Sequence, residues 1–476
     1  MKKVIVVLFM LTASYYCQAQ EMWGIANSNY AGTMGLHLNP ASVVNSYVQQ
    51  EIHILSGDIF INNNYIYLRE GTHPLGKMIT GQSISDDDYL DDYNTSDKFM
   101  YKNVQFKYPG FYYSRKDFGF AINFGTRTNT SINDFPYHLA KFFWEGFDYT
   151  PQHNQNFESG KYTLNSYLVN EVSLTLGKNL VRSSNHEVNV GITIQPTFGH
   201  AGASIDNRIH NYLVPNSDTM ITSVLQADYA HAIPNFGNTG SEKFSLLKVR
   251  GTGVGASFGM RYTSYLGNSG ITTAYKNRRL RSYRYRLGFS LLDVGFTSFK
   301  KDQTNLDFDV DNVLWDGIST VKITSVEFAD SLFSTVFLGG TQAIDNNSNF
   351  NVFLPMALSG QLDVSLTARI YAATNFIAPI PLNTHTVKRP TQFSITPRYE
   401  VPDFEVSLPY SLYRMKDSRL GLAARYKWFI LGTDMLGPWL ALDDMYGFDL
   451  YFGFKISSYP NSKSRNRKNN PCPAFN

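Results

Sequence analysis

Residues 118–125 read Phe-Gly-Phe-Ala-Ile-Asn-Phe-Gly, with a large apolar side chain at each even-numbered position and a small or polar one at each odd-numbered position. Because successive side chains of a β-strand point to opposite faces, this stretch predicts a strand with one apolar face and one small, polar face. The same alternation returns along much of the chain. It predicts an all-β fold, an antiparallel transmembrane β-barrel whose apolar face contacts lipid.

The first 19 residues have the features of a secretory signal peptide. Lys2 and Lys3 precede the apolar run 4–13, and Cys17 and Ala19 are small residues at positions that suit signal peptidase. The apolar run is too short to cross a bilayer, which disfavours the alternative of an uncleaved anchor. We therefore expect export, and residence in the outer membrane of a gram-negative bacterium.

The mature sequence limits the possible classes of membrane protein and of covalent site. After residue 19 it contains no apolar stretch of 18 or more residues, so no spanning helix is expected. A membrane protein of this kind must then be a closed barrel. Loss of Cys17 with the signal leaves Cys472 as the only cysteine, which excludes an internal disulfide and a cysteine metal cluster.

The charge distribution argues against a nucleic-acid partner. Two of the 42 basic residues lie in the signal and four lie in the tail, which leaves 36 against 39 acidic residues, a net charge of −3 for the body. A surface that binds phosphates needs a basic patch, and none is evident.

Aromatic residues make up 15% and charged residues 17%, which suits a barrel with aromatic girdles; a large soluble β-sandwich remains the alternative.

Strand candidates separated by short turns recur along the chain, most regularly near its C-terminal end. Several of them match in length the ~9 to 11 residues that a tilted membrane strand needs. The 13 candidates are 51–61, 104–113, 118–128, 166–177, 187–198, 249–262, 283–296, 362–375, 391–400, 404–413, 419–426, 429–435 and 447–456. A barrel with both ends in the periplasm needs an even number of strands, so we predict 14, with 12 and 16 as alternatives.

Four long segments interrupt these strands and predict long outer loops. They are approximately 69–100, 129–163, 200–245 and 298–335. Two short helices are expected in them, which would line or plug the lumen or cover it as lids. Asp134 would cap a helix carrying Phe135, Leu139 and Phe143, and Asp218 one carrying Ile221, Val224, Leu225 and Tyr229. Residues 457–476 predict a basic, disordered periplasmic tail.

The short motifs give little support for an enzyme. Gly255-Ala256-Ser257-Phe258-Gly259 matches a nucleophile elbow, but it lies in an alternating strand rather than at a sharp strand-to-helix turn. The ten histidines show no convincing ligand spacing, and the acidic loop around 86–92 lacks a calcium-loop pattern. We therefore expect no catalytic residue, no metal and no cofactor, and we interpret the acidic loop as solvated.

An Asn-Pro-Ala sequence at Asn39, Pro40 and Ala41 lies between the signal and the first strand. It resembles the motif in the N-terminal plug of barrels of the long-chain fatty-acid transporter type. The resemblance implies that a plug-like segment over 20–50 docks inside a barrel that spans 51–456, with a turn at Asn-Pro.

The order of motifs over the whole mature chain resembles an uncharacterised family of predicted outer-membrane barrels, related to those transporters and to barrel subunits of the type IX secretion system. The motifs that carry it are Asn39-Pro40-Ala41, Ser-Leu-Leu-Asp-Val-Gly (290–295), Leu354-Pro355, Pro-Arg-Tyr-Glu (397–400), Leu408-Pro409, Gly-Leu-Ala-Ala-Arg (421–425) and Leu-Gly-Thr-Asp (431–434). The family has no established activity to transfer.

Five charged residues fall inside predicted strands: Asp293, Arg398, Glu400, Arg425 and Asp434. An arginine on the lipid face near the bilayer midplane costs ~2 to 4 kcal/mol, so these side chains should face the lumen and pair there. They would contact a ligand or, equally, brace a packed barrel.

Two functions fit these features. The first is a plugged channel or transporter for small or hydrophobic molecules. The second is a non-transporting subunit of a secretion or cell-surface assembly, whose loops or basic tail bind protein partners. Contacts with outer-membrane lipid and lipopolysaccharide are expected in either case. A soluble exported β-rich protein is the third reading.

Overall fold

The computed structural model describes residues 21–72, 74–82, 84–85, 88–234, 248–265, 272–275, 278–281, 283–341 and 344–459. The predicted signal peptide, Asp86 and Asp87 of the acidic loop, and the predicted basic tail from Pro460 onward lie outside these ranges. None of the helices found in the described ranges is long and apolar enough to cross a membrane.

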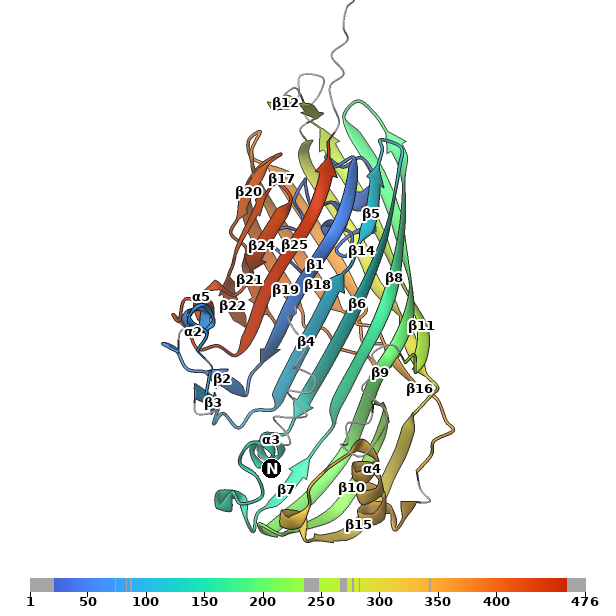
Figure 1. Ribbon diagram of the computed structural model, residues 1–476, viewed down its shortest axis with the longest axis vertical. Coiled ribbons are helices and arrows are strands. Elements are labelled where there is room, and N and C mark those ends of the chain that lie inside the picture. Colours follow the sequence, from blue (N-terminus) through green and yellow to red (C-terminus); the bar gives the residue numbers. More distant parts are fainter. Residues whose placement is uncertain are drawn as a thin grey trace, which may run out of the picture.

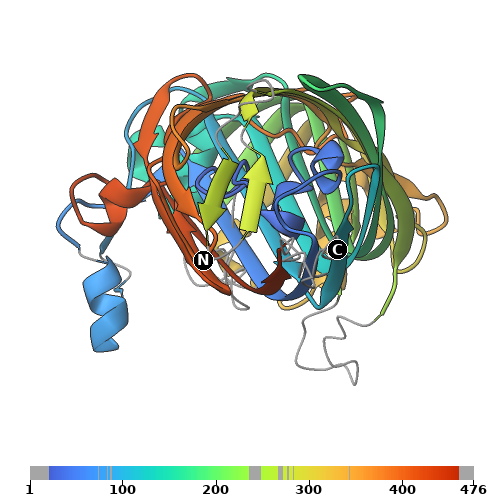
Figure 2. The same cartoon turned by 90° about the horizontal axis from the view of Figure 1, so that it is seen from above.

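Within the described residues, 14 antiparallel strands close into a barrel, which confirms the predicted fold class and strand number (Figure 1; Figure 2). In order around the barrel they are β1 (Gln50–Asn63), β4 (Lys98–Lys107) with β5 (Gly110–Ser114), β6 (Phe118–Phe135), β8 (Tyr162–Arg182), β9 (His186–Asn216), β11 (Gly251–Tyr265), β14 (Tyr283–Phe299), β16 (Phe350–Phe353) with β17 (Ala357–Ser365), β18 (Ile370–Pro379), β19 (Gln392–Val401), β20 (Phe404–Ser407) with β21 (Tyr410–Tyr413), β22 (Asp417–Leu420) with β23 (Leu422–Tyr426), β24 (Phe429–Thr433) and β25 (Gly447–Ser458). Pairing of β1 with β25 closes the ring, so no strand edge of the barrel wall is left open.

The two faces of β6 have the environments that its sequence predicts. Phe118, Phe120 and Phe124 are 50%, 37% and 45% exposed on the outside. Gly119 and Asn123, which alternate with them, are buried on the lumen side. Apolar side chains are exposed in the same way on β8, β11, β14 and β17, so the barrel carries an apolar outer belt.

The two ends of the barrel differ in their connections. At the upper end of Figure 1 lie the start of β1, the end of β25 and short turns such as 115–117 and 427–428. At the lower end lie the longer connections, which contain most of the helices (Figure 1). Outer-membrane barrels have short periplasmic turns and long external loops, so we refer to the upper end as periplasmic and the lower end as outer.

The prediction of a single strand over 362–375 is wrong, because these residues form a hairpin of two strands. β17 ends at Ser365 and β18 begins at Ile370, and the two strands pair antiparallel. The turn contains neither Gly nor Pro; instead, the Thr367 hydroxyl accepts the N–H groups of Arg369 (3.2 Å) and Ile370 (3.0 Å). Splitting this one candidate into two strands raises the 13 candidates to the 14 strands that were predicted and are observed.

The helix predicted after Asp218 is also wrong, because these residues form β10 (Thr219–Ala232), which pairs with β9 and with β15 (Thr304–Asp316). Register shifts between Thr222 and Val224 and between Gln226 and Ala227 interrupt the period of two. With the strand period broken, the apolar spacing resembled that of a helix. Much of the segment predicted as a loop over 200–245 is therefore strand.

An outer lobe stands beyond the barrel at its outer end (Figure 1). Its elements are the outer part of β9, β7 (Asn156–Ser159), β10, β15, α3 (Tyr137–Glu145), η4 (Thr150–Gln152), η5 (Ile318–Thr320) and α4 (Val326–Leu338). It has its own apolar core, to which α3 contributes Phe142 and α4 contributes Phe337. A helix near Asp134 therefore exists, although Pro136 precedes its first turn and Phe135 belongs to β6; it packs in this lobe and not in the lumen.

The remaining described elements are small. At the outer end they are β2 (Ile66–Leu68), α2 (Pro74–Thr80), β3 (Tyr89–Asp91) and α5 (Leu436–Trp439), and at the periplasmic end β12 (Thr272–Tyr275) and β13 (Arg278–Arg281). Asp88 and Asp91 of the acidic loop pair with Lys77 and Lys141, each at 2.6 Å. Hydrogen bonds from Lys77 and Ser85 lower the pKa of Asp88 to about 2.

A charge on the outer face should impair membrane assembly far more than the same charge in the lumen. We expect Phe120→Arg to cost up to ~2 to 4 kcal/mol, depending on its depth in the bilayer. Gln105→Arg is the matched control, because Gln105 lines the polar lumen and donates to Glu171 (3.2 Å). Heat-modifiable gel mobility of the membrane fraction measures the folded share; equal yields of the two variants would contradict the assignment of the faces.

Candidate functional site

The N-terminal segment 21–49, which we call the plug, fills the lumen on the periplasmic side (Figure 2). Its apolar side chains are almost fully buried, with Trp23 at 1% and Met34 at 0% exposed. Two short 3₁₀ helices, η1 (Gly32–Gly35) and η2 (Pro40–Val43), give it a compact path.

The Asn-Pro-Ala motif forms the start of η2. The Asn39 side chain accepts the N–H of Ala41 (2.9 Å), and Pro40 occupies the first position of the helix, where its missing N–H is not needed. The Asn39 amide also donates to the Met260 carbonyl (3.1 Å) and to Gln361 Oε1 (2.8 Å). The motif therefore caps η2 and attaches it to β11 and β17.

A row of four glycines forms the wall beneath η2. Gly119, Gly177, Gly191 and Gly259 are in register on the neighbouring strands β6, β8, β9 and β11. A Cβ added at any of them would come within 3.0 Å of atoms of residues 39–44. Glycine in a strand interior can mark the close approach of another backbone, and here the glycine row lets η2 lie directly against the wall.

Four of the five predicted lumen charges are held by ion pairs, three of them in a belt near the periplasmic end. Arg398 pairs with Asp363 (2.8 Å) and with Glu400 (3.3 Å), and Arg425 pairs with Glu405 (3.0 Å). All of these side chains are buried. Removing one partner of such a pair costs about 3 to 5 kcal/mol, because a buried charge is left uncompensated.

The same belt holds the backbone of the plug. Glu400 accepts the N–H of Asn29 (3.2 Å), and Glu405 accepts the Ser28 hydroxyl (2.7 Å). Further along the wall, Glu51 of β1 accepts the N–H of Thr33 (3.0 Å). Lys455 of β25 pairs with Glu51 (3.0 Å) and donates to the carbonyl of Ala31 (2.6 Å).

Asp293 lies nearer the outer end and owes its direction to a β-bulge. The register between β11 and β14 shifts here, Asp293 has φ 52° and Gly295 has φ 159°. The side chain meets Arg127 (2.8 Å), which also pairs with Glu171 (3.2 Å). The N–H of Asp293 donates to the Ser257 hydroxyl (3.1 Å), so this serine supports the bulge within the wall.

Asp434, the fifth predicted charge, differs because hydrogen bonds rather than an ion pair hold it. It accepts the N–H of Trp23 and the hydroxyl of Tyr451, both at 3.1 Å. It therefore attaches the beginning of the plug to the wall.

Sequence reasoning missed most partners of these charges, although one signal was present. The missed residues in these ion pairs are Arg127, Glu171, Asp363 and Glu405, and other charged lumen residues that it missed are Glu21, Glu51, Arg261, Arg286, Arg389 and Lys455. Those on strands have the same parity as the small lumen-facing residues; Arg261, for example, continues the series Gly255, Ser257, Gly259. Assigning the lumen face of every predicted strand from its small residues would have identified the charged residues on that face.

A loop closes the lumen from the outer end. Residues 380–391, between β18 and β19, fold inward and bury Val387 beside Leu354. They join an outer apolar cluster of Phe60, Tyr101, Tyr167, Val169, Ala232, Phe299, Phe350, Val352, Leu354, Val387, Tyr413 and Met435. Arg389 of this loop pairs with Glu21 of the plug (2.8 Å), so the two closures touch.

His37 of the plug lies beside this contact. Burial and the nearby charge of Lys107 lower the pKa of His37, while Glu21 acts in the opposite direction. His37 is therefore neutral at pH 7, and its Nε2–H donates to the Glu21 carbonyl (3.1 Å).

Among the cavities of the described residues, two small ones lie beside the plug. One, of about 70 Å³, borders Arg261, Arg286 and Asp363, and the other, of about 50 Å³, borders Arg127, Asp293 and Arg389. Each has room for only a few water molecules. The described residues contain no group of three His, Cys, Asp or Glu side chains arranged to hold a metal ion.

The sequence comparisons identify the family. Residues 40–434 match DUF5723, described as a family of unknown function, and the chain therefore belongs to this family. This confirms the predicted membership of an uncharacterised family. The comparison with curated proteins gives no match.

The structural comparisons return outer-membrane barrels. The toluene transporter TbuX of Ralstonia pickettii is 9% identical with a TM-score of 0.40, over 90% of this chain and 94% of that chain. A deltaS2 mutant of the monoaromatic hydrocarbon channel TodX is 9% identical with a TM-score of 0.39, over 90% and 95%. A FadL homologue of Pseudomonas aeruginosa is 11% identical with a TM-score of 0.29, over 92% and 98%.

Adding one methyl group to the glycine row should displace η2. A Cβ at Gly191 would lie 2.5 Å from the carbonyl carbon of Pro40, so we expect Gly191→Ala to destabilise the protein by ~1 to 3 kcal/mol through overpacking. Gly360→Ala is the matched control, because no atom lies within 4 Å of the added Cβ. Thermal unfolding in detergent compares the two; similar losses would show that the close approach is not needed.

Proposed function

We propose that this chain is a gated outer-membrane barrel that accepts small apolar molecules at its outer end and releases them to the periplasm when the plug rearranges. The observation that supports this most directly is the division of the lumen into two zones. The outer apolar cluster surrounds the entrance, whereas the periplasmic half is occupied by the plug, held by hydrogen bonds and ion pairs.

The outer cluster suits an apolar ligand because its side chains come from many separate strands and from one loop. Phe60, Tyr167 and Phe299 belong to different strands, and Val387 belongs to the loop 380–391. An apolar molecule that displaces this loop would replace its contacts with the aromatic side chains at little cost in buried apolar area.

The polar contacts of the plug suit a gate. A net contribution of ~0.5 to 1.5 kcal/mol for each hydrogen bond is large enough in sum to keep the plug seated. It is small enough for individual contacts to exchange with water during a partial rearrangement. The ion pair between Arg389 and Glu21 would couple displacement of the outer loop to the beginning of the plug.

Entry of an apolar dye into intact cells tests the proposal, because lipopolysaccharide slows the passage of such molecules. Cells that make the protein should take up 1-N-phenylnaphthylamine faster than cells with an empty vector. A variant that lacks residues 24–45 should admit the dye and also a polar antibiotic that the outer membrane normally excludes. No increase with either protein, at equal amounts of folded barrel, would rule out transport.

Breaking the contact between loop and plug should loosen the gate. Arg389→Gln leaves Glu21 uncompensated, so we expect a loss of about 3 to 5 kcal/mol in unfolding free energy and faster dye entry. The double variant Glu21→Gln, Arg389→Gln should recover part of the stability. Lys388→Gln, at an exposed neighbouring position, should change neither quantity; an equal effect there would contradict the role of the pair.

The outer lobe favours a second candidate, a subunit of a secretion or cell-surface assembly that binds protein partners. Its separate apolar core, with Phe142, Tyr212 and Phe337, gives it the rigidity of a docking module. Gentle detergent extraction followed by sizing decides between the candidates. A lone monomer without co-purifying chains counts against an assembly role.

A further inference from the structure

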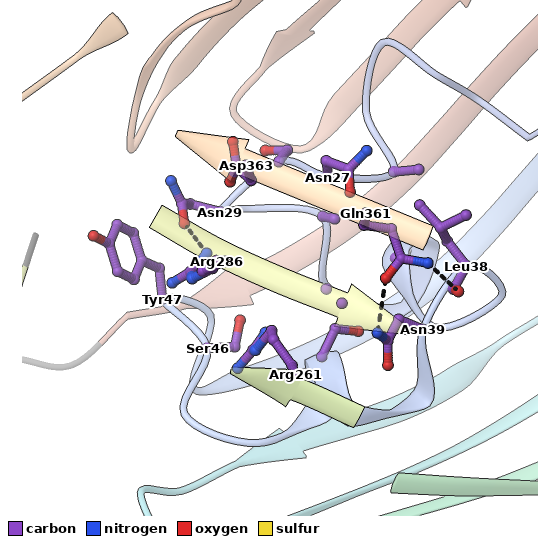
Figure 3. A pocket seen from close by; sticks show the side chains of 17 residues that line it. Asn27, Asn29, Leu38, Asn39, Ser46, Tyr47, Arg261, Arg286, Gln361 and Asp363 are labelled. Carbon is purple, nitrogen blue, oxygen red and sulfur yellow. Dashed lines mark hydrogen bonds between the residues drawn. The ribbon is translucent and has the colours of Figure 1, made fainter. Parts of the chain in front are cut away.

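The cavity of about 70 Å³ lies between the plug and the barrel wall near the periplasmic end (Figure 3). Arg261 of β11, Arg286 of β14 and Asp363 of β17 border it from the wall, and Asn29 and Tyr47 border it from the plug (Figure 3). The proposed route for apolar molecules gives these charged groups no role.

The two arginines are close neighbours on the lumen face. Arg261 is in register with Gly288, and Thr263 is in register with Arg286, so the arginines occupy diagonal positions on paired strands. Long side chains at diagonal positions can reach each other. Because guanidinium groups stay charged in proteins, two like charges lie side by side in a buried site.

Neutral groups are the hydrogen-bond acceptors of both arginines. Arg261 donates through Nη2 to the carbonyl oxygen of Val44, and Arg286 donates through Nη1 to the Asn29 side chain. Arg286 also stacks on Tyr283, with its guanidinium carbon 3.8 Å from the ring centre. The Nε atoms of both arginines are buried without a hydrogen-bond partner.

Two carboxylates lie near this pair without forming an ion pair with it: Glu187 of β9 attracts Arg261 electrostatically, and Asp363 attracts Arg286. Among the described residues, no carboxylate oxygen lies within 4.0 Å of a guanidinium nitrogen of Arg261 or Arg286. Asp363 borders the cavity, but its Oδ2 is engaged by Arg398 (2.8 Å) and Tyr283 (2.5 Å). By contrast, Arg127 and Arg425 in the same lumen each pair with a carboxylate.

Burying a charge without a direct ion pair is costly, and burying two of the same sign together is more so. We propose that this cavity is a binding site for one small monovalent anion, a simple carboxylate or a halide, which accepts the free Nε–H groups of Arg261 and Arg286. The volume has room for such an anion and excludes a bulky one. The site differs from the outer apolar cluster in position and in ligand.

The anion would also act on the plug. Arg261 holds Val44 and Arg286 holds Asn29, two plug residues that are far apart along the segment. An anion bound between the guanidinium groups would fix both side chains and with them both contacts. Anion binding would therefore stabilise the closed state.

Binding of carbon-14 formate to the purified full-length protein in detergent tests the site, with equilibrium dialysis at constant ionic strength. We expect saturable binding of about one formate per chain, competition by chloride, and no competition by gluconate, which is too large for the cavity. Absence of saturable binding, or equal competition by gluconate, would overturn the proposal. This measurement needs no variant and no transport, so its result is independent of the proposed function.

Two variants locate the bound anion. We expect Arg261→Gln and Arg286→Gln each to weaken formate binding at least tenfold and to abolish the rise in unfolding temperature that formate causes in the unchanged protein. Arg419→Gln is the control, because Arg419 is a half-buried cation for which no ion pair is formed among the described residues, and it stacks on Tyr413 (4.1 Å) away from this cavity. Unchanged binding in both test variants, or an equal loss in the control, would place the anion elsewhere.

Discussion

The contact of η2 with the glycine row sets the position of the whole plug. A barrel of 14 strands encloses more space than its own side chains fill, so something has to occupy the lumen or leave it open. Glycine at four registered positions lets the plug lie against the wall there, with backbone against backbone at Gly119 and Gly191 and plug side chains against the wall at Gly177 and Gly259. With η2 held against this surface, the segments on either side of it are brought to the charged belt and to Asp434.

The charged groups of the lumen follow from this placement. A strand-borne charge in a membrane barrel avoids lipid by facing inward, and the interior then has to satisfy it. Arg425 and Lys455 find carboxylates on neighbouring strands, and Arg398 finds them on its own strand and two strands away; Glu400 and Glu51 use their remaining capacity for the plug backbone. The wall and the plug thus satisfy each other's polar groups, and the sites where this matching is incomplete are the ones that point to a ligand.

The lumen combines two kinds of chemistry along its axis. Its outer end is lined by aromatic and aliphatic side chains and closed by an inward-folded loop, and its periplasmic half is polar and closed by the plug. The pair Arg389–Glu21 joins these closures. The transport function proposed for this member of DUF5723 rests on these two connected closures.

The sequence by itself determined the all-β class and the faces of strands such as β6, because the alternation of side chains is a local property with a period of two. It located 13 strand candidates, and the need for an even number led to the correct prediction of 14. It also identified Asp293, Arg398, Glu400 and Arg425 as charges inside strands, whereas Asp434, predicted with them, lies just beyond the end of β24. It failed where local signals were weak or interrupted, at the turn 366–369 and at the bulges of β10. Only the tertiary structure decided that Gly119, Gly177, Gly191 and Gly259 form one row, and that Arg261 and Arg286 lie side by side while Arg398 meets Asp363. These relations depend on the register between strands that are far apart in the chain, which no local pattern encodes.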